Sequence, residues 1–396
     1  MALDRTVVES YAPLPAVEVS IVMPCLNEAE TLEACIRKAK LAIARDHLDA
    51  EIIVADNGSR DQSVTIATAL GARVVHARQR GYGSAIRAGV EASQGRYVII
   101  GDADDSYDFG AIGPFVERLR SGADLVMGNR FAGGIEQGAM PWKHRYIGNP
   151  VLTAIGRILF RVGIGDFHCG LRAIRKDAYD GLKLRTTGME FASEMVVKAA
   201  LNHLRIAEVP TVLHKDGRSR PPHLRSFRDG WRHLRFMLLF SPRWLFLLPG
   251  LGLLVGGAIA SGVLVLAPVQ LGPFGFDIGT LLVASFLCLI GYQVILFGVF
   301  TKIFAVREGF HPPHAALQRL YQRMTLEVGL IAGGALTVCG LLMLVIATLH
   351  WRAMGFSGLD PRVEMRELIP SVVMMALGVQ TVFASFFLSI LGIESR

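Results

Sequence analysis

YVIIGDADDSYDF, residues 97–109, joins a strand pattern directly to a cluster of acids. Four apolar or aromatic residues typical of a buried strand run into Gly101 and then into carboxylates that include Asp102 and Asp104. In an open α/β sheet, the carboxyl ends of the strands form the edge where ligands bind. Two aspartates separated by one residue offer hard oxygen ligands that suit Mg²⁺ or Mn²⁺ bridging a diphosphate. Short acidic turns are also common on solvated loops, so this interpretation needs support from the rest of the chain.

The preceding segments alternate between strand and helix patterns. Strands are predicted at residues 19–23, 51–55 and 73–77, and helices at residues 63–70 and 85–92. Such alternation predicts a mostly parallel sheet with helices on both faces and right-handed crossovers. Ile86 stands where a dinucleotide fingerprint needs its third glycine, and no P-loop lysine follows a glycine-rich loop. The pattern therefore argues against a Rossmann dehydrogenase and a P-loop NTPase.

Polar clusters follow three of the predicted strands. They are Asn27 with Glu28, Asp56 with Asn57 and Ser59, and Asp102 with Asp104. Because the carboxyl ends of parallel strands meet at one edge of the sheet, we expect the clusters to converge. Convergence would distinguish a binding site from three unrelated solvated turns.

Together with three later motifs, these clusters resemble the family 2 nucleotide-sugar glycosyltransferases over residues 18–240. The motifs are MGNRF at residues 127–131, GDFHCGLR at residues 165–172 and GRSR at residues 217–220. Within that family the sequence is most similar to the dolichyl- or polyprenyl-phosphate sugar synthases. The resemblance implies a GT-A-type α/β domain with a mostly parallel sheet that binds the nucleotide sugar. An all-α domain of four transmembrane helices would follow it.

The resemblance also implies roles for individual residues. The nucleotide sugar would be bound by Pro24, Asn27, Glu28, Val54, Asp56, Asn57, Ser59, Gly83, Asp102, Ala103, Asp104 and Arg220. The metal, Mg²⁺ or Mn²⁺, would be held by Asp102 and Asp104. The acceptor phosphate would meet Arg130, Arg145, Arg172, Arg218 and Arg220, because a planar guanidinium binds two phosphate oxygens at once. The catalytic residues would be Asp104, Arg130 and Arg145.

The chemistry is consistent with this assignment. A divalent cation neutralises the leaving diphosphate, and a lipid phosphate monoester, whose second pKa is about 6, attacks as an anion without a general base. We therefore expect metal-dependent, inverting transfer of one sugar to a membrane polyprenyl phosphate. One alternative is a processive polysaccharide synthase, although the chain lacks the Gln-x-x-Arg-Trp motif usual there. Another is a non-catalytic membrane protein with a vestigial transferase domain.

Several residues have competing interpretations. Each of the candidate arginines is also compatible with a surface position or a contact to anionic lipid. Asp166 is compatible with orienting an arginine or with capping a helix. Glu190 and Glu194 lie on a helix predicted at residues 189–202, and a charged, solvated helix face is the preferred interpretation.

The second half of the chain predicts a membrane domain. The 396 residues are 52% hydrophobic, which is high for a soluble enzyme. Four uncharged runs, each able to cross about 30 Å of hydrocarbon, occupy residues 245–269, 278–301, 328–349 and 368–393. Residues 302–324 are basic and residues 270–277 contain no Lys or Arg, so the basic loop, both termini and the catalytic domain are expected on the cytoplasmic side. The expected membrane is a bacterial inner membrane. Without a charge inside any run, the spans are expected to anchor the protein, form an oligomer or hold a lipid tail.

Two amphipathic segments precede the spans. Residues 146–162 fit either a helix on the bilayer surface or a core helix, and residues 224–240 are predicted to form an interfacial helix with arginines on its polar side. The expected divisions are a leader at residues 1–17, the transferase domain at residues 18–222, a juxtamembrane helix at residues 223–243 and the membrane domain at residues 244–396.

Composition narrows the remaining partners. The net charge is +7, but no Lys/Arg-rich run interleaved with aromatic residues occurs in the first half, so nucleic acid is not an expected partner. The five cysteines show no Cys-x-x-Cys spacing, which fits a reducing compartment without structural zinc.

Overall fold

The computed structural model describes residues 17–219, 226–312, 325–356, 358 and 360–392. The chain divides into two compact units, Met1–Met237 and Leu238–Arg396. The expected leader lies almost wholly outside the described residues. Each unit is considered separately.

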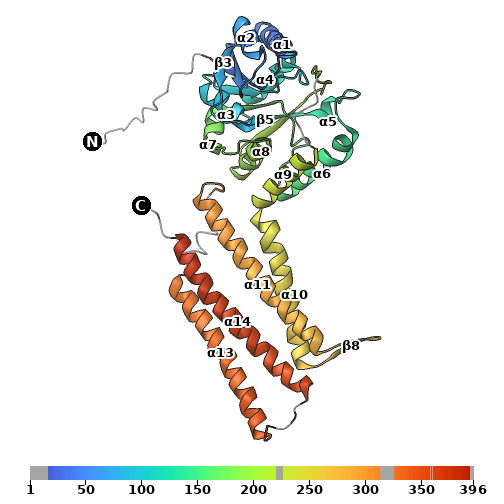
Figure 1. Ribbon diagram of the computed structural model, residues 1–396, viewed down its shortest axis with the longest axis vertical. Coiled ribbons are helices and arrows are strands. Elements are labelled where there is room, and N and C mark those ends of the chain that lie inside the picture. The colour runs from blue at the N-terminus through green and yellow to red at the C-terminus, as the bar shows by residue number, and fades with distance from the viewer. Residues whose placement is uncertain (1–16, 220–225, 313–324, 357, 359, 393–396) are drawn as a thin grey trace, which may run out of the picture. The chain divides into compact units, whose positions relative to one another are not determined.

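The first unit is built on a seven-stranded sheet (Figure 1). Its strands are β1 (Val19–Cys25), β2 (Ala50–Asp56), β3 (Arg73–His76), β4 (Tyr97–Ile100), β5 (Leu125–Asn129), β6 (Arg172–Arg175) and β7 (Ile206–Pro210), in the order β3-β2-β1-β4-β6-β5-β7. Only β6 runs antiparallel to its neighbours, β4 and β5. The mostly parallel sheet expected from the sequence is therefore confirmed.

Helices connect the strands and cover the sheet. They are α1 (Leu32–Arg45), α2 (Ser63–Ala69), α3 (Tyr82–Ala92), η1 (Phe109–Ala111), α4 (Gly113–Arg120), α5 (Arg130–Gly133), η2 (His144–Gly148), α6 (Asn149–Phe160), α7 (Lys176–Leu182), α8 (Phe191–Leu201) and α9 (Ser226–Leu239). On one face, Ile21 and Ile99 share a core with residues of α1 and α4. On the other face α3 lies so close that a Cβ on Gly89 would meet Val22 at 2.5 Å. Burial of both faces explains why the strands are almost continuously apolar.

The first strand extends further than predicted, through Pro24 to Cys25. Asn57 N–H donates to the Cys25 carbonyl, which faces β2, so the nitrogen of Pro24 faces β4. Strand β4 ends at Ile100, opposite Val22, and no ladder bond is lost at the proline. Proline therefore fits at this position, and the predicted strand end was two residues too early.

Helix α6 has an exposed apolar face. Val151 and Ile158 of α6 and Ile147 of the preceding turn η2 are each at least half exposed, whereas Gly156 packs against the ring of Phe167. This exposed stripe matches the surface helix rather than the core helix among the two predicted alternatives. Helix α9 exposes Trp231, which an interfacial helix would turn to the bilayer, and buries His233, Phe236 and Met237. Part of this predicted segment lies outside the described residues.

In the part of the second unit that the structure describes, four helices are long and apolar (Figure 1). They are α10 (Leu248–Leu266), preceded by the π-helical turn η3 (Arg243–Leu247), then α11 (Ile278–Arg307), α13 (Leu326–Ala353) and α14 (Pro361–Gly392). Each is long and apolar enough to cross a membrane, as the four runs predicted. The connection before α11 forms a hairpin of β8 (Val269–Leu271) and β9 (Phe274–Phe276), which the sequence reading missed.

Glycines bring these helices together. A Cβ on Gly257 of α10 would meet the carbonyl oxygen of Ala284 at 2.6 Å, and one on Gly333 of α13 would meet that of Gly378 at 2.7 Å. The neighbouring Gly256 has nothing within 4 Å of the same position. Backbones approach closely only where no side chain intervenes, so one glycine of the pair is required for packing and the other is not.

This contrast gives a matched test of the α10–α11 contact. We expect Gly257→Ala to destabilise the membrane unit by about 1–3 kcal/mol, because the new methyl group meets backbone that cannot move alone. Gly256→Ala should leave stability unchanged or slightly raised, since alanine favours the helix. Thermal unfolding of both variants in detergent measures the difference, and equal midpoints would contradict the observed packing.

Candidate active site

Three loops meet at one edge of the sheet. Strands β2, β1 and β4 are adjacent and parallel, so the loops that follow Asp56, Cys25 and Ile100 emerge side by side. Strands β5 and β7 end at the same edge, and antiparallel β6 begins there. The polar clusters predicted to converge therefore lie on one edge, together with residues that follow β5 and precede β6.

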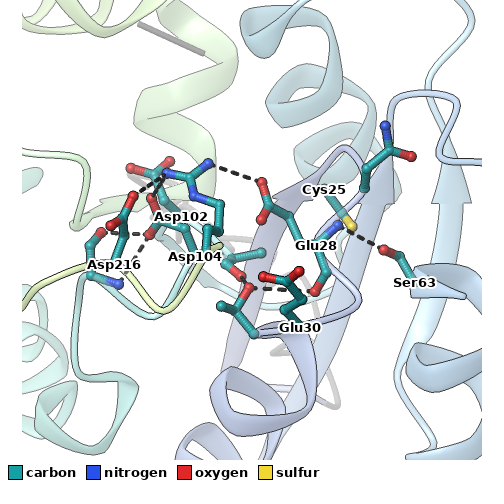
Figure 2. Close-up of polar contacts among 12 residues, drawn as sticks. Cys25, Glu28, Glu30, Ser63, Asp102, Asp104 and Asp216 are labelled. Atoms are coloured by element: carbon teal, nitrogen blue, oxygen red, sulfur yellow. Dashed lines mark hydrogen bonds and ion pairs between the residues drawn. The ribbon is translucent and has the colours of Figure 1, made fainter. Parts of the chain in front are cut away.

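The first loop is attached to the second by hydrogen bonds. Asn27 N–H donates to Ser59 Oγ at 2.9 Å, and Asn27 Oδ1 accepts from Arg60 N–H at 2.7 Å. Glu28 N–H donates to Ser63 Oγ at 2.8 Å (Figure 2). Asn27 adopts a left-handed conformation, φ 58°, which asparagine tolerates better than most residues. These bonds fix the direction in which Glu28 enters the site.

The second loop is organised by Asp56 and Asn57. Asp56 accepts from the backbone of Gly58 and Ser59 and from His76 Nδ1, at 3.0–3.1 Å. Burial pushes the pKa of Asp56 upward, but these hydrogen bonds outweigh it, and the pKa lies below its usual value. Asn57 accepts from Gly81 N–H at 2.8 Å. Both side chains are thus already hydrogen-bonded, Asp56 to its own loop and to β3, and Asn57 to the segment that leads into α3.

The third loop carries Asp102 and Asp104. Tyr82 Oη donates to Asp102 Oδ1 at 2.9 Å, and Asp104 Oδ1 accepts from both the amide and the hydroxyl of Ser106. Burial and then the charge of Asp104 raise the pKa of Asp102 to about 6. Asp105 has a left-handed φ of 62° and pairs with Lys38 at 2.8 Å. The charge of Asp104 disfavours the ionised form of Asp102, so a cation bound between the two carboxylates would be stabilised.

Arg218 spans the first and third loops. Its Nη2 lies 2.5 Å from Asp104 Oδ2, its Nη1 lies 3.2 Å from Glu28 Oε1, and Asp216 is 3.4 Å away. Figure 2 shows Asp102, Asp104 and Asp216 gathered on one side and Glu28 on the other, joined by these contacts. The carboxylates of the site therefore already bind one positively charged group, the guanidinium of Arg218.

Asp102 and Asp104 also have the donor chemistry for a divalent cation. Within the described ranges, no three His, Cys, Asp or Glu side chains are grouped to hold a metal ion. Mg²⁺ commonly takes one or two carboxylates and completes its shell with substrate phosphates and water. The pair of aspartates fits such a shared site and does not fit a metal cage made by protein alone.

Residues 214–219, called the strap below, lie across the third loop. His214 N–H donates to the Ser106 carbonyl and Gly217 N–H to the Asp104 carbonyl. Ser219 donates twice to Glu30, at 2.7 and 2.6 Å. A Cβ on Gly217 would meet Thr31 at 2.9 Å, so the strap lies tightly against the first loop. The strap carries Arg218 into the site.

Arg130 is held by Asp166. Its Nε and Nη2 donate to the two carboxylate oxygens at 2.6 and 2.8 Å, and its backbone N–H donates at 3.1 Å. Both side chains are buried. Of the two interpretations of Asp166, orienting an arginine is the one observed.

The other arginines predicted to meet the acceptor are placed differently. Arg172 is buried and donates to the carbonyls of Ala192 and Cys169, so its guanidinium is committed to the protein backbone. Arg145 lies over the ring of Tyr146, 5.5 Å from its centroid, and remains partly exposed. Arg220 lies outside the described residues.

The donor residues also divide into two groups. Pro24, Asn27, Glu28, Asp56, Asn57, Ser59, Asp102, Ala103 and Asp104 all lie at the strand ends of β1, β2 and β4 or in the loops that follow. The side chain of Val54, in contrast, lies inside the core with full burial. Gly83 belongs to the first turn of α3, where its N–H donates to the Thr187 carbonyl.

The preferred interpretation of Glu194 as part of a solvated helix face is wrong. Glu194 is only 1% exposed, pairs with Lys198 at 2.9 Å and accepts from Thr186 Oγ1 at 2.6 Å. These hydrogen bonds outweigh burial and hold the pKa of Glu194 below its usual value. Glu194 thereby orders the segment that contains Thr187, whose carbonyl accepts the hydrogen bond from Gly83 N–H.

Sequence reasoning missed several residues that shape the site. They are His76, Tyr82, Tyr107 and Glu30. Tyr82 stands between Gly81 and Gly83, of which only Gly83 was assigned to the nucleotide-sugar site. None of these residues belongs to a spacing pattern, because each acts through a partner distant in sequence.

A pair of histidines lies beside the site. Ser193 Oγ is 3.3 Å from His168 Nε2 and 2.8 Å from His233 Nδ1, and the two rings are 4.7 Å apart. Burial, then the positive charges of His233, Arg130 and Arg172, hold the pKa of His168 well below its usual value. His168 is therefore neutral at physiological pH.

Two family models match the chain. Residues 20–182 match glycosyl transferase family 2, and residues 299–392 match the glycosyltransferase family 2 C-terminal transmembrane region. The low-salt glycan biosynthesis hexosyltransferase Agl6 of Haloferax volcanii is 38% identical over 376 residues, 94% of this chain and 89% of that protein. A dolichyl-phosphate hexose transferase of the same organism is 29% identical over 49% of this chain and 81% of its own length.

Among solved structures, glucosyl-3-phosphoglycerate synthase from Mycobacterium tuberculosis, in complex with Mn²⁺, UDP and glucosyl-3-phosphoglycerate, matches with a TM-score of 0.45 and 24% identity. The match covers 56% of this chain and 79% of that one.

The sheet and its acidic edge, followed by apolar helices, define a membrane protein with a glycosyltransferase domain. The chain belongs to glycosyltransferase family 2, and it is a glycosyltransferase.

The buried ion pair of Arg130 and Asp166 predicts a large loss of stability when one partner is removed. We expect Asp166→Ala to destabilise the transferase unit by about 3–5 kcal/mol, because Arg130 is left buried without its counter-charge. Glu33→Ala breaks an exposed pair with Arg37 and should cost less than about 1 kcal/mol. Denaturant unfolding compares the two, and equal costs would show that the buried pair is not what holds this region.

The neutral state of His168 predicts a pH effect. Below a pH of about 6.5 the unfolded chain binds a proton at this residue that the folded chain refuses, so stability falls as pH drops. The loss approaches about 1.4 kcal/mol per pH unit for one proton. Unfolding midpoints between pH 7 and 5.5 should fall less steeply in His168→Gln than in the parent. Identical slopes would contradict a neutral, enclosed His168.

Proposed function

We propose that this protein transfers a single hexose from a nucleotide diphosphate sugar to a membrane polyprenyl phosphate, with inversion and with Mg²⁺ or Mn²⁺. The observation that carries the proposal is the pair Asp102 and Asp104 at the carboxyl edge of the sheet, with a guanidinium lodged against Asp104. The names of the two Haloferax relatives, a hexosyltransferase and a dolichyl-phosphate hexose transferase, support the hexose and the lipid.

In this proposal each loop has a task. Asp56, kept ionised by its hydrogen bonds, accepts an N–H of the donor base. Asn27, Asn57 and Ser59 set the shape of the nucleotide pocket through their bonds to the backbone or to each other. Pro24 and Glu28 border the pocket, whereas Val54 contributes through its backbone because its side chain is buried. Gly83 gives room at the start of α3, where a Cβ would meet Thr186.

Asp102 and Asp104 would hold the divalent cation, and Ala103 between them, whose side chain is buried in the core, would meet the ribose only through its backbone. When bound, the cation stabilises the negative charge that develops on the leaving diphosphate. Tyr82 keeps Asp102 oriented, and Ser106 keeps Asp104 oriented. The remaining positive charge near the diphosphate comes from Arg218 and Arg220.

The acceptor phosphate is already an anion at neutral pH, so it needs orientation more than proton removal. Arg145, partly exposed, is proposed to bind it. Arg130 is proposed to support the acceptor-binding surface from inside the protein, since its guanidinium is bonded to Asp166. Arg172 is reassigned from phosphate binding to positioning, because it donates to the carbonyls of Ala192 and Cys169.

The proposal places the transferase domain and both termini in the cytoplasm. Lys302 and Arg307 lie at the carboxyl end of α11, whereas residues 270–277 contain no basic residue. The proposed divisions are residues 1–17, 18–222, 223–243 and 244–396. The exposed stripe of Ile147, Val151 and Ile158 is suited to the bilayer surface, and the spans are suited to self-association.

The test is incorporation of label into lipid. Membranes containing the protein are incubated with labelled nucleotide hexoses, polyprenyl phosphate and Mg²⁺ or Mn²⁺, then extracted with organic solvent. Asp104→Ala should lower lipid-soluble label by about 100-fold or more, because charge stabilisation of the leaving group is lost. Asp177→Ala, an exposed aspartate paired with Arg175, should keep full activity.

The outcome also separates the alternatives. Polymeric product instead of a single sugar on lipid would indicate a processive synthase. Donor binding without any transfer would indicate a non-catalytic protein. Full activity of Asp104→Ala would contradict the proposal that Asp104 holds the metal.

A further inference from the structure

Both oxygens of Asp104 are engaged. Oδ1 accepts two hydrogen bonds from Ser106, which fix the carboxylate within its own turn. Oδ2 faces the guanidinium of Arg218 at 2.5 Å. A divalent cation on Asp104 must therefore use the oxygen that Arg218 now contacts. Two positive groups on one oxygen repel each other, so the two are competitors for this position.

One nitrogen of the Arg218 guanidinium lacks a hydrogen-bond partner in the described part of the chain. Its Nη atoms contact Asp104, Glu28 and Asp216, yet its Nε is buried and finds no hydrogen-bond partner among the described residues. A buried N–H without an acceptor carries a desolvation cost that any new acceptor would remove. Phosphate oxygens are acceptors of the kind a guanidinium binds through two nitrogens.

The strap transmits any movement of Arg218. Gly217 donates to the Asp104 carbonyl, and Ser219 donates to Glu30, on either side of Arg218 in the sequence. Withdrawal of the guanidinium removes the strap's side-chain contacts with Glu28 and Asp104, leaving mainly the backbone bonds and Glu30. The position of the strap is thus linked to the occupant of Asp104.

We infer that Arg218 is a built-in competitor of the divalent cation. Binding of the cation to Asp104 displaces the guanidinium, loosens residues 214–219 and frees Arg218 to bind an anionic phosphate. Metal loading and strap opening then favour each other, because linkage between two binding events is reciprocal. The inference rests on the proposed metal site at Asp102 and Asp104.

Direct metal titration tests it without donor or acceptor. Mn²⁺ binding to the full-length protein in detergent is followed by electron paramagnetic resonance. Removing the competitor in Arg218→Gln should tighten Mn²⁺ binding about 5- to 150-fold, the usual range for coupled sites. Lys38→Gln is the matched control, because it removes an equal charge from neighbouring Asp105 without touching Asp104. It should change Mn²⁺ affinity by much less.

Hydrogen exchange gives a second readout. In the parent, Mg²⁺ should speed exchange of peptides that cover residues 214–219, where Gly217 and Ser219 amides are bonded. In Arg218→Gln, exchange there should be fast before Mg²⁺ is added and change little afterwards. This readout is local, so it also shows whether the rest of the variant's transferase unit is folded.

Several results would overturn the inference. They are an equal or weaker Mn²⁺ affinity in Arg218→Gln, an equal gain in Lys38→Gln, slower strap exchange with Mg²⁺, or no Mn²⁺ binding by either protein. Failure of hexose transfer in the parent would count against the proposed function alone, because neither measurement uses a substrate. Transfer with no change in Mn²⁺ affinity would overturn the competition and leave the function intact.

Discussion

Gathering carboxylates at one edge of a sheet is the constraint on which this site depends. Like charges side by side raise the free energy of the folded chain unless positive charge or hydrogen-bond donors compensate them. Burial raises the pKa of Asp102, and the neighbouring charge of Asp104 adds to the rise. Each of three residues reduces this free-energy cost by donating a hydrogen bond to one of the two carboxylates: Tyr82, Ser106 and Arg218. The edge is therefore stable only as a network, and its shape follows from which donors are present.

The elements that form this edge could be read from the sequence because their signals are local. Strand β4 was predicted at its observed bounds, since four residues of strand character end at a glycine. The meeting of the loops after β1, β2 and β4 followed from the parallel order alone. The end of β1 was predicted too early, at Pro24, because the cost of a proline in a strand depends on which neighbouring strand its nitrogen faces. That information exists only once the sheet is assembled.

The partners of side chains could not be read in the same way. Arg218 pairs with Asp104, 114 residues earlier, and with Glu28, 190 residues earlier. Glu194 looked like one acid of a solvated helix, yet its helix is buried almost all round and the loop before it turns back onto the carboxylate. A motif tells which residue types are present, whereas burial decides whether an arginine such as Arg172 meets a ligand or the backbone.

Two arginine–aspartate pairs at this edge show how geometry separates a fixed role from a changing one. Arg130 and Asp166 are both buried, are joined through two parallel hydrogen bonds and share a third from the backbone. Every contact would be lost at once if either moved, and an unpaired buried charge is expensive, so this pair is static. Arg218 instead contacts three acids through its Nη atoms, and its Nε has no hydrogen-bond partner among the described residues. The strap that carries it is otherwise held by backbone bonds and by the side chains of Ser219 and His214. The environment of Arg218 offers it more negative charge than one guanidinium can neutralise, and that surplus is what a divalent cation would meet.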